Sequence, residues 1–434
     1  MNLGSSVENG SLDDLKSLYE NDNNIIKQLI NEETIFYLAC KYGHLDMARW
    51  IYSIDQDQIY IKSIRCCTSF YISCYYGYFD MAKWIYSIDP NQIKVSNNSN
   101  QTPFYVACLN GHIDIVKWIY SIDPDQIKIK NKNSFTPFHA TCSNKRIDIA
   151  KWIYSIDPDQ IKIENINGFT SFYASCYNGN FDIAKWIYSI DPDQLNIKNN
   201  VGFTSFYASC YNGHIDIAKW IYSIDSKQIK IRTNVGYTPL YTACLNGQLD
   251  VVKWIYSIDP EQIKIKINGL IAFHAGLTAF HTDLTAFHAA YCNKHLNVLQ
   301  FLIDKDINIL YDSFNYDDYD ILYDLNIEYD VCEQIVKKGC VKFKEFMITY
   351  VFRKYNVDWN SKYNIFQNIK EKFGKCCNCP FCKTESYFNK IYDDELFHNS
   401  ECKICFMNFN NNVYVSTCGH ILCYNCLNQL VHNS

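Results

Sequence analysis

One residue type recurs at a fixed interval along most of the chain, and this interval restricts the fold more than any other feature. Seven of the eight tryptophans stand 34 residues apart. They are Trp50, Trp84, Trp118, Trp152, Trp186, Trp220 and Trp254. A period of this length is typical of repeat arrays, in which each repeat packs only against its neighbours. Such an array accommodates 434 residues without one large core, whereas a single core rarely grows past about 300 residues.

Each repeat predicts two short helices. In the repeat covering residues 204–237, apolar residues recur at i, i+3, i+4 and i+7 up to Ile224, and we expect Asp216 to open this helix. The preceding helix often begins with Thr-Pro, as at Thr102, which places a capping hydroxyl before a proline. Asp-Pro, as at Asp123, ends the second helix before a polar loop. Neither helix buries its apolar side alone, so we expect each repeat to stack on the next.

The composition limits the function classes. A formal net charge of -6 argues against a general nucleic-acid binder. The N-terminus lacks a basic region followed by an apolar one, and no apolar stretch approaches the roughly 18 residues of a membrane span. We therefore expect a cytoplasmic protein, in which 21 cysteines are not a disulfide framework. Seven cysteines share the repeat phase and are expected to fill the core: Cys40, Cys74, Cys108, Cys142, Cys176, Cys210 and Cys244.

The segment GYTPLYTACLNGQLDVVKWIYSID, residues 236–259, resembles an ankyrin repeat. The resemblance implies an all-α solenoid of helix-turn-helix repeats, and the repeat with Trp-Ile-Tyr-Ser-Ile is similar to ankyrin proteins of giant amoebal viruses and amoebae. For a viral protein the expected location is the host cytosol. Tyrosine mostly replaces the signature histidine, which remains at His139 and His288. Lys145 stands at the turn glycine of its repeat, where we expect a local weak point.

The chain is expected to have four parts. They are a degenerate capping repeat at residues 1–33, eight ankyrin-like repeats at 34–303, an acidic linker and helical connector at 304–375, and a Cys-rich end at 376–434. Three tandem copies of a Phe-His heptad near the end of the array predict an insertion at residues 269–283.

The repeats differ from one another mainly before each helix-opening Thr and near the turn. In ankyrin-like arrays these positions form fingertip loops and a concave face, where a protein substrate or host protein binds. The alternative is that each Phe packs against the next finger. The candidate partner-binding residues are Phe135, Phe169, Phe203 and Tyr237 before the Thr, with Tyr177 and Tyr211 near the turn.

The last 59 residues hold nine cysteines, and several have the spacing of zinc ligands. ECKICFMNFNNNVYVSTCGHILCYNC resembles the front part of a C3HC4-type RING finger, a small α+β module that binds two Zn²⁺ ions. The resemblance assigns Cys402, Cys405, Cys423 and Cys426 to the first ion, and Cys418 with His420 to half of the second.

The closing Cys-x-x-Cys of the family is expected roughly ten residues after Cys426, beyond the eight residues that follow it, so the finger reads as incomplete. Cys379 and Cys382 form a similar pair upstream and would complete the second site in a permuted finger. Two rivals remain open. One is a separate knuckle that adds Cys376 or Cys377, and the other is a truncated finger with its first ion only.

RING fingers of this kind hold a ubiquitin-charged conjugating enzyme so that a substrate lysine attacks its thioester. By family position, Ile404 and Leu430 would contact that enzyme, and Lys383 would brace ubiquitin if the finger is permuted. The alternative for Ile404 and Leu430 is ordinary packing. The sequence thus predicts an ankyrin array that captures a protein and a finger that promotes its ubiquitination. The rival hypotheses are a non-enzymatic scaffold with a degenerate finger and a finger that mediates dimerisation.

Overall fold

The computed structural model describes residues 2–268, 283–306, 388–392, 413–416 and 421–423. The chain divides into two compact units, residues 1–239 and 240–434, which are taken separately below. Within the described residues the array is built from helices, as the fold class predicted. None of these helices is long and apolar enough to cross a membrane.

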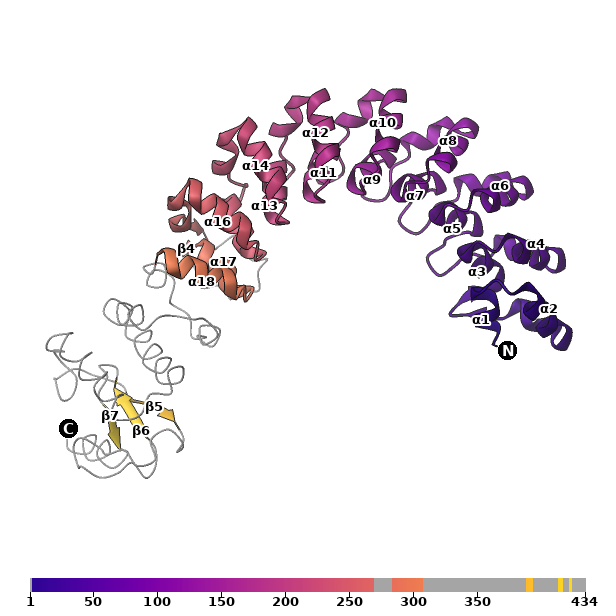
Figure 1. Ribbon diagram of the computed structural model, residues 1–434, viewed down its shortest axis with the longest axis horizontal. Helices are drawn as coiled ribbons and strands as arrows, with labels where there is room; N and C mark the ends of the chain where they lie inside the picture. The colour runs from indigo at the N-terminus through magenta and orange to yellow at the C-terminus, as the bar shows by residue number, and fades with distance from the viewer. Residues whose placement is uncertain (1, 269–282, 307–387, 393–412, 417–420, 424–434) are drawn as a thin grey trace. The chain divides into compact units, whose positions relative to one another are not determined.

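Unit 1 consists of helix pairs in single file (Figure 1). The odd-numbered helices lie along its inner side and the even-numbered helices along its outer side. A first pair, α1 and α2, precedes the pairs that carry the Trp period. The pairs are α1 (Leu3–Glu8) and α2 (Leu12–Asn21), α3 (Ile35–Tyr42) and α4 (Leu45–Ile54), α5 (Ser69–Tyr76) and α6 (Phe79–Ile88), α7 (Pro103–Asn110) and α8 (Ile113–Ile122), α9 (Pro137–Ser143) and α10 (Ile147–Ile156), α11 (Ser171–Tyr177) and α12 (Phe181–Ile190), α13 (Ser205–Tyr211) and α14 (Ile215–Ile224).

The helix ends follow the local chemistry of the sequence. The Thr102 hydroxyl accepts a hydrogen bond from the Tyr105 amide (3.2 Å) and Pro103 opens α7, as the Thr-Pro pattern predicted. The prediction that Asp216 caps α14 is wrong, because this helix begins at Ile215 and Asp216 lies inside its first turn. In that position its negative charge still interacts favourably with the positive N-terminal end of the helix dipole.

Aromatic contacts join neighbouring repeats. Trp118 on α8 packs against Phe70 on α5 (6.2 Å between ring centroids) and meets Tyr86 on α6 edge-on (5.4 Å). Fully buried phenylalanines occupy the Phe70 position in successive repeats, and several of them make the same contact with the Trp of the next repeat. Ile224, by contrast, is 37% exposed, so the apolar stripe we expected does not reach the end of its helix.

The segment after each second helix is more ordered than the polar loop we expected. It forms a one-turn 3₁₀ helix in which a glutamine is buried. In the third repeat the Gln126 side-chain amide donates to the Asp123 carboxylate (3.1 Å), which also accepts from the Asp125 amide. The 3₁₀ helices are η1 (Asn23–Lys27), η2 (Gln56–Tyr60), η3 (Pro90–Lys94), η4 (Pro124–Lys128), η5 (Pro158–Lys162), η6 (Pro192–Asn196), η7 (Ser226–Lys230) and η8 (Pro260–Lys264).

A tight hairpin loop, called a finger below, precedes each first helix. The first finger pairs β1 (Leu29–Ile30) with β2 (Glu33–Thr34). The later fingers of unit 1 are residues 63–67, 97–101, 131–135, 165–169, 199–203 and 233–237. Each of these is closed by its own backbone hydrogen bond. From the finger at 97–101 onward, a further bond links each finger to the one before it, as when the Lys132 amide donates to the Ser99 carbonyl (3.0 Å). The later fingers of unit 1 therefore form a continuous row.

Unit 2 contains the last helices of the array and a separate small sheet. Its helices are α15 (Pro239–Leu245), α16 (Leu249–Ile258), α17 (Ala286–Cys292) and α18 (Leu296–Lys305). Strand β3 (Ile267–Asn268) pairs with β4 (Asp283–Leu284), so residues on either side of the expected insertion meet at its base. Strands β5 (Phe388–Tyr392), β6 (Val413–Ser416) and β7 (Ile421–Cys423) form an antiparallel sheet in the order β5-β6-β7. The domain boundaries drawn from the sequence stay a prediction.

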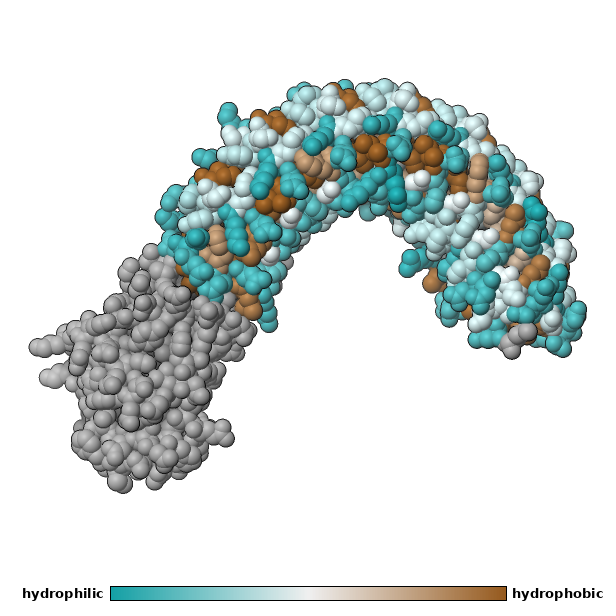
Figure 2. All heavy atoms as spheres, viewed as in Figure 1, coloured by the Kyte–Doolittle hydropathy of each residue, from teal (hydrophilic) through white to brown (hydrophobic). Residues whose placement is uncertain are grey.

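In the view of Figure 2, the apolar side chains on the surface of the array do not form one continuous patch. Figure 2 shows hydrophobic side chains as separate brown spots divided by polar teal ones. Among the most exposed of them are Ile64 and Ile166, at 67% and 55%, which lie in two different fingers. Isolated apolar side chains of this kind are ordinary on a protein surface.

Lys145 replaces the turn glycine of its repeat and adopts a φ of 62°. Where glycine is kept, a bulky side chain of the next repeat covers it: a Cβ on Gly111 would lie 2.8 Å from Arg146, and one on Gly179 2.7 Å from His214. Opposite Lys145, the corresponding position holds the smaller Asn180, whose amide donates to the Cys142 carbonyl (2.7 Å). The exchange of a large partner for a small one makes room for the lysine side chain.

We predict that Lys145 and Asn180 are coupled. Asn180→His alone should destabilise the array by about 1–2 kcal/mol, because the ring would meet the Lys145 Cβ. Combined with Lys145→Gly, it should restore stability to near that of the parent chain, since this recreates the pairing at Gly179 and His214. Urea denaturation of the four proteins measures the coupling energy. Strictly additive effects would contradict this account.

Candidate functional site

The six candidate partner-binding residues all belong to unit 1. Phe135, Phe169 and Phe203 end successive fingers and are half-buried. Tyr237 ends the next finger and is also half-buried, and burial raises the pKa of its hydroxyl. Tyr177 and Tyr211 are the last residues of α11 and α13.

The finger phenylalanines pack on first helices. Phe169 lies flat on Tyr173 with ring centroids 4.5 Å apart, and Phe203 lies on Tyr207 at 4.4 Å. Phe135 instead meets His139 edge-on at 5.6 Å. These contacts are with the helix that follows each finger in its own repeat, whereas the alternative to partner binding had placed them on the next finger.

A row of stacked rings crosses two repeats of the inner side. Tyr173 stacks with Tyr177 (6.1 Å), and Tyr177 stacks with Tyr211 of the following repeat (6.0 Å). Together with Phe169, these residues are called the aromatic row below. Tyr177 is 39% exposed, while burial raises the pKa of the Tyr173 hydroxyl and keeps it neutral. The row joins three of the six candidates, Phe169, Tyr177 and Tyr211.

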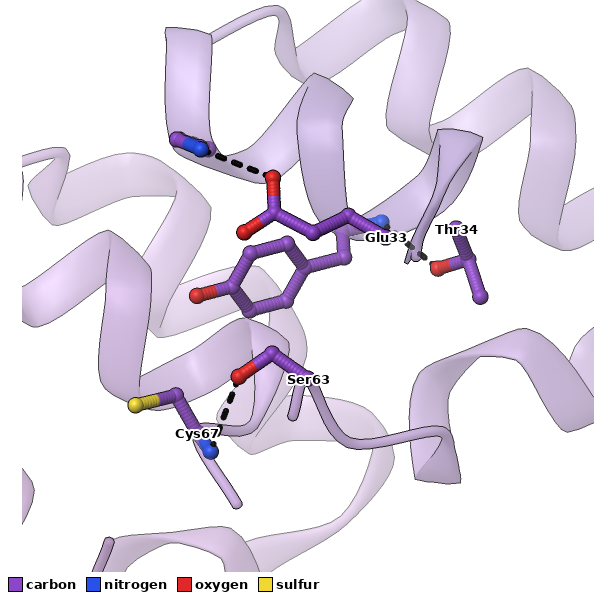
Figure 3. A network of polar contacts seen from close by, with 6 residues as sticks. Glu33, Thr34, Ser63 and Cys67 are labelled. Atoms are coloured by element: carbon purple, nitrogen blue, oxygen red, sulfur yellow. Dashed lines mark hydrogen bonds and ion pairs between the residues drawn. The ribbon is translucent and has the colours of Figure 1, made fainter. Parts of the chain in front are cut away.

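A polar network near the first finger was not anticipated from the sequence (Figure 3). The Lys41 ammonium pairs with the Glu33 carboxylate at 2.7 Å, and the Ser63 hydroxyl accepts from the Cys67 amide at 3.2 Å. Burial raises the pKa of the Tyr37 hydroxyl, which also bonds to Ser63. A group so strongly held neutral is a poor proton donor at neutral pH, so we assign this network to stability.

His139 keeps the signature histidine of the repeat, and it is buried. Its Nδ1 accepts a hydrogen bond from the Thr136 amide (3.3 Å), while Nε2 lies 3.3 Å from the Phe169 carbonyl. Burial lowers the pKa of His139 to about 4. In other repeats a tyrosine at this position bonds to an asparagine of the next finger, as Tyr105 does with Asn131 (3.3 Å). The corresponding Asn165 side-chain nitrogen is buried without a partner, and so is that of Asn199, which follows a repeat that has Tyr173 at this position.

This pairing predicts a pH effect on stability. His139 titrates near 6.5 when unfolded and near 4 when folded, so the unfolded chain binds the proton first as the pH falls. Its contribution to stability is complete above pH 6.5 and is lost towards pH 4, by up to about 3 kcal/mol. Replacement by Tyr, which does not titrate in this range, should remove that loss.

Urea denaturation of the parent chain and His139→Tyr between pH 7 and pH 4.5 measures the difference, and effects of other groups cancel in the comparison. His112→Asn is a matched control, since its imidazole lies at the turn and Nε2 is 2.9 Å from the Tyr75 carbonyl. Parallel pH curves for the parent chain and His139→Tyr would contradict the assignment.

The seven cysteines in phase with the repeat are fully buried free thiols, as expected for core residues. Burial raises the pKa of each of them, so they remain protonated and are poor metal ligands. Within the described ranges no cluster of three or more His, Cys, Asp or Glu side chains is arranged to hold a metal ion. His288 serves the fold instead, because its Nδ1 accepts from the Thr285 amide (3.0 Å).

Most of the predicted zinc ligands lie outside the described residues. Cys423 ends β7, and the four residues that separate β6 from β7 in the sequence include Cys418 and His420. The other seven predicted ligands belong to segments of which the structure describes nothing: Cys379, Cys382, Cys402, Cys405, Cys418, His420 and Cys426. The same holds for Ile404, Leu430 and Lys383. The donor set itself, thiolates in Cys-x-x-Cys pairs with one imidazole, fits tetrahedral zinc.

Comparison with protein families agrees with both parts of this description. A family model described as ankyrin repeats (3 copies) matches residues 3–94, 70–165 and 172–268. These matches cover more than half of the sequence, and the chain belongs to the ankyrin-repeat family. A second model, the C3HC4-type zinc finger (RING finger), matches residues 402–434. A comparison with curated proteins gives no match.

These matches carry a general functional conclusion. Ankyrin repeats imply protein–protein interaction, and a RING finger implies zinc binding and points to ubiquitin transfer. The stacking of Phe169 and Phe203 on tyrosines four positions later, and of Tyr177 on Tyr211 one repeat later, was not anticipated. The repeated Phe-Thr-Ser-Phe-Tyr of two successive repeats is the sequence signal that would have revealed the first two contacts.

Proposed function

We propose that this protein is an ankyrin-based RING-type ubiquitin ligase. The inner side of the array binds a protein substrate or host protein, and the RING finger recruits a ubiquitin-conjugating enzyme to that bound protein. The observation that carries the first half is the aromatic row, in which Tyr177 is 39% exposed. Exposed tyrosines on a rigid scaffold are typical anchors of protein interfaces.

The RING finger positions the conjugating enzyme and carries out no covalent chemistry itself. Zn²⁺ would stabilise the fold of the RING finger. Ile404 and Leu430 would contact the conjugating enzyme, so that a lysine of the bound protein reaches the thioester. Free thiols throughout the described array support a cytoplasmic location, host cytosol if the protein is viral, because oxidising compartments favour disulfides.

We assign Cys402, Cys405, Cys423 and Cys426 to the first zinc ion, and Cys418, His420, Cys379 and Cys382 to the second. The pairing of β5 with β6 supports the contribution of the upstream cysteines. Strand β5 begins six residues after Cys382 and lies outside the RING match, yet its residues pair with β6 in register, Phe388 opposite Ser416. The segment after Cys382 therefore belongs to the same sheet as the RING residues, and Lys383 would lie close to the second ion.

Ubiquitin transfer is testable with the full chain, an activating enzyme and a panel of conjugating enzymes. We expect chains on the protein itself with at least one conjugating enzyme. Cys405→Ala and Ile404→Ala should each abolish them, the first by loss of zinc and the second with zinc content unchanged. Cys292→Ala, a change in the array, is the control for the cysteine substitution. No chains with any conjugating enzyme, from protein that retains its zinc, would leave a non-enzymatic binding scaffold.

Zinc stoichiometry tests the ligand assignment. We expect two zinc ions per chain by elemental analysis. The Cys379→Ser/Cys382→Ser variant should retain one, because a site with only Cys418 and His420 does not hold a structural ion. The matched control is Cys376→Ser/Cys377→Ser, which should retain both ions. Loss of an ion from the control would favour a separate knuckle, and one ion in the parent chain a truncated finger.

A further inference from the structure

Charge is divided between the two sides of unit 1. From residue 61 to 239, the inner layer comprises the fingers, first helices and turns, namely residues 61–78, 95–112, 129–146, 163–180, 197–214 and 231–239. This layer contains eight Lys and Arg but only one acidic residue, Glu164. The second helices and 3₁₀ helices between these segments contain thirteen acidic and ten basic residues. The overall charge of -6 therefore conceals a basic inner layer.

Half of the inner-layer cations lie in one repeat. Lys132 is in the finger before α9 and Lys130 directly precedes that finger, whereas Lys145 and Arg146 follow the C-terminal end of α9. All four are exposed, and residues 129–146 contain no acidic side chain. None of the ion pairs found in the described residues involves them. These four residues are called the basic cluster below.

The basic cluster adjoins the aromatic row. Helix α9 packs directly against α11, the helix that carries Tyr173 and Tyr177. Arg146 is held in place by a hydrogen bond from its Nε to the Leu109 carbonyl (3.3 Å), and the turn residue His214 by one between its Nε2 and the Tyr177 carbonyl (2.9 Å). Positive charge and exposed tyrosine thus occupy neighbouring positions on a rigid surface.

We propose that this surface binds an extended acidic segment of another protein, with carboxylates at the basic cluster and an apolar or aromatic side chain against Tyr177 and Tyr211. The inference rests on the proposed function of the array and specifies its partner. Charge complementarity favours the acidic segment, because four cations without ion-pair partners on one repeat attract carboxylates and repel a cationic ligand. Opposite charge also speeds encounter, and this gain falls with ionic strength.

A single-stranded nucleic acid also carries negative charge, but the rings do not suit it. Bases bind by stacking on free aromatic faces. In the aromatic row the faces are used within the protein, since Phe169 covers Tyr173 at 4.5 Å with an angle of 17° between the rings, and Tyr177 stacks with Tyr211. Tyr173 and Tyr177 each stack with two other rings, which leaves less ring face for bases, whereas a tyrosine hydroxyl suits the polar groups of a peptide.

The test is affinity selection of a random 16-residue peptide display library on the full-length, zinc-loaded chain at physiological salt. We expect the enriched peptides to be acidic and to share at least one aromatic or large apolar residue. Lys130→Glu/Lys132→Glu should weaken binding of a selected peptide by about tenfold or more, and Tyr177→Ala by about tenfold. The matched control, Lys117→Glu/Lys151→Glu, makes the same change of charge on exposed residues of the outer helices and should alter the affinity less than about twofold.

Circular dichroism confirms that each variant is folded before binding is compared. Enriched peptides that are neutral or basic, or equal weakening by both double variants, would overturn the acidic partner while leaving protein binding intact. Enrichment of no peptide at all would overturn the protein-binding function as well. Binding of a 20-nucleotide single-stranded RNA more tightly than the selected peptides, with loss in the Lys130/Lys132 variant, would overturn the proposal in favour of nucleic acid.

Discussion

The contact between neighbouring repeats is the interaction on which the rest of the array depends. Helices as short as α9 (Pro137–Ser143) and α14 (Ile215–Ile224) are marginal alone, because nucleation is unfavourable and few hydrogen bonds follow it. Each is stabilised by burying apolar side chains against the next repeat, where Trp, Phe and Tyr meet at the same positions every 34 residues. This regular interface also fixes the spacing of the fingers, whose backbone bonds then run from one to the next.

The same interface decides where the sequence is free to vary. The second helices repeat almost the same residues because each contacts a nearly identical neighbour, whereas the fingers and turns differ from repeat to repeat. Even there, change is paired across the interface: the repeat with Lys145 in place of glycine faces Asn180, whereas Gly111 faces Arg146 and Gly179 faces His214. Variation on the inner side is thus permitted where it does not alter the spacing of the stack, which leaves that side available for recognition.

Periodicity and capping chemistry made the helix pairs, the Thr-Pro starts and the buried in-phase cysteines predictable, since these depend on a few neighbouring residues. The 3₁₀ helices were missed because Asp-Pro was interpreted only as a helix stop, while the burial of Gln126 depends on packing between elements. Three residues of the aromatic row were predicted from the sequence, but the contacts among them were not. Whether Phe169 stacks on Tyr173 or on the next finger depends on side-chain geometry that spacing alone does not specify. The assignment of the zinc ligands is based on their spacing and on the family resemblance.

The overall charge of a repeat protein is a weak guide to what it binds. A value of -6 for the whole chain argues against nucleic acid only if the charge is evenly distributed, and from residue 61 to 239 the inner layer is basic while the outer layer is acidic. The stronger argument comes from the rings: Tyr173 and Tyr177 each stack with two other aromatic rings, which leaves less ring face for bases. Basic charge beside aromatic rings with covered faces distinguishes an acidic peptide from a nucleic-acid strand, and it is this combination, set by the stacking of two repeats, that gives the array its expected selectivity.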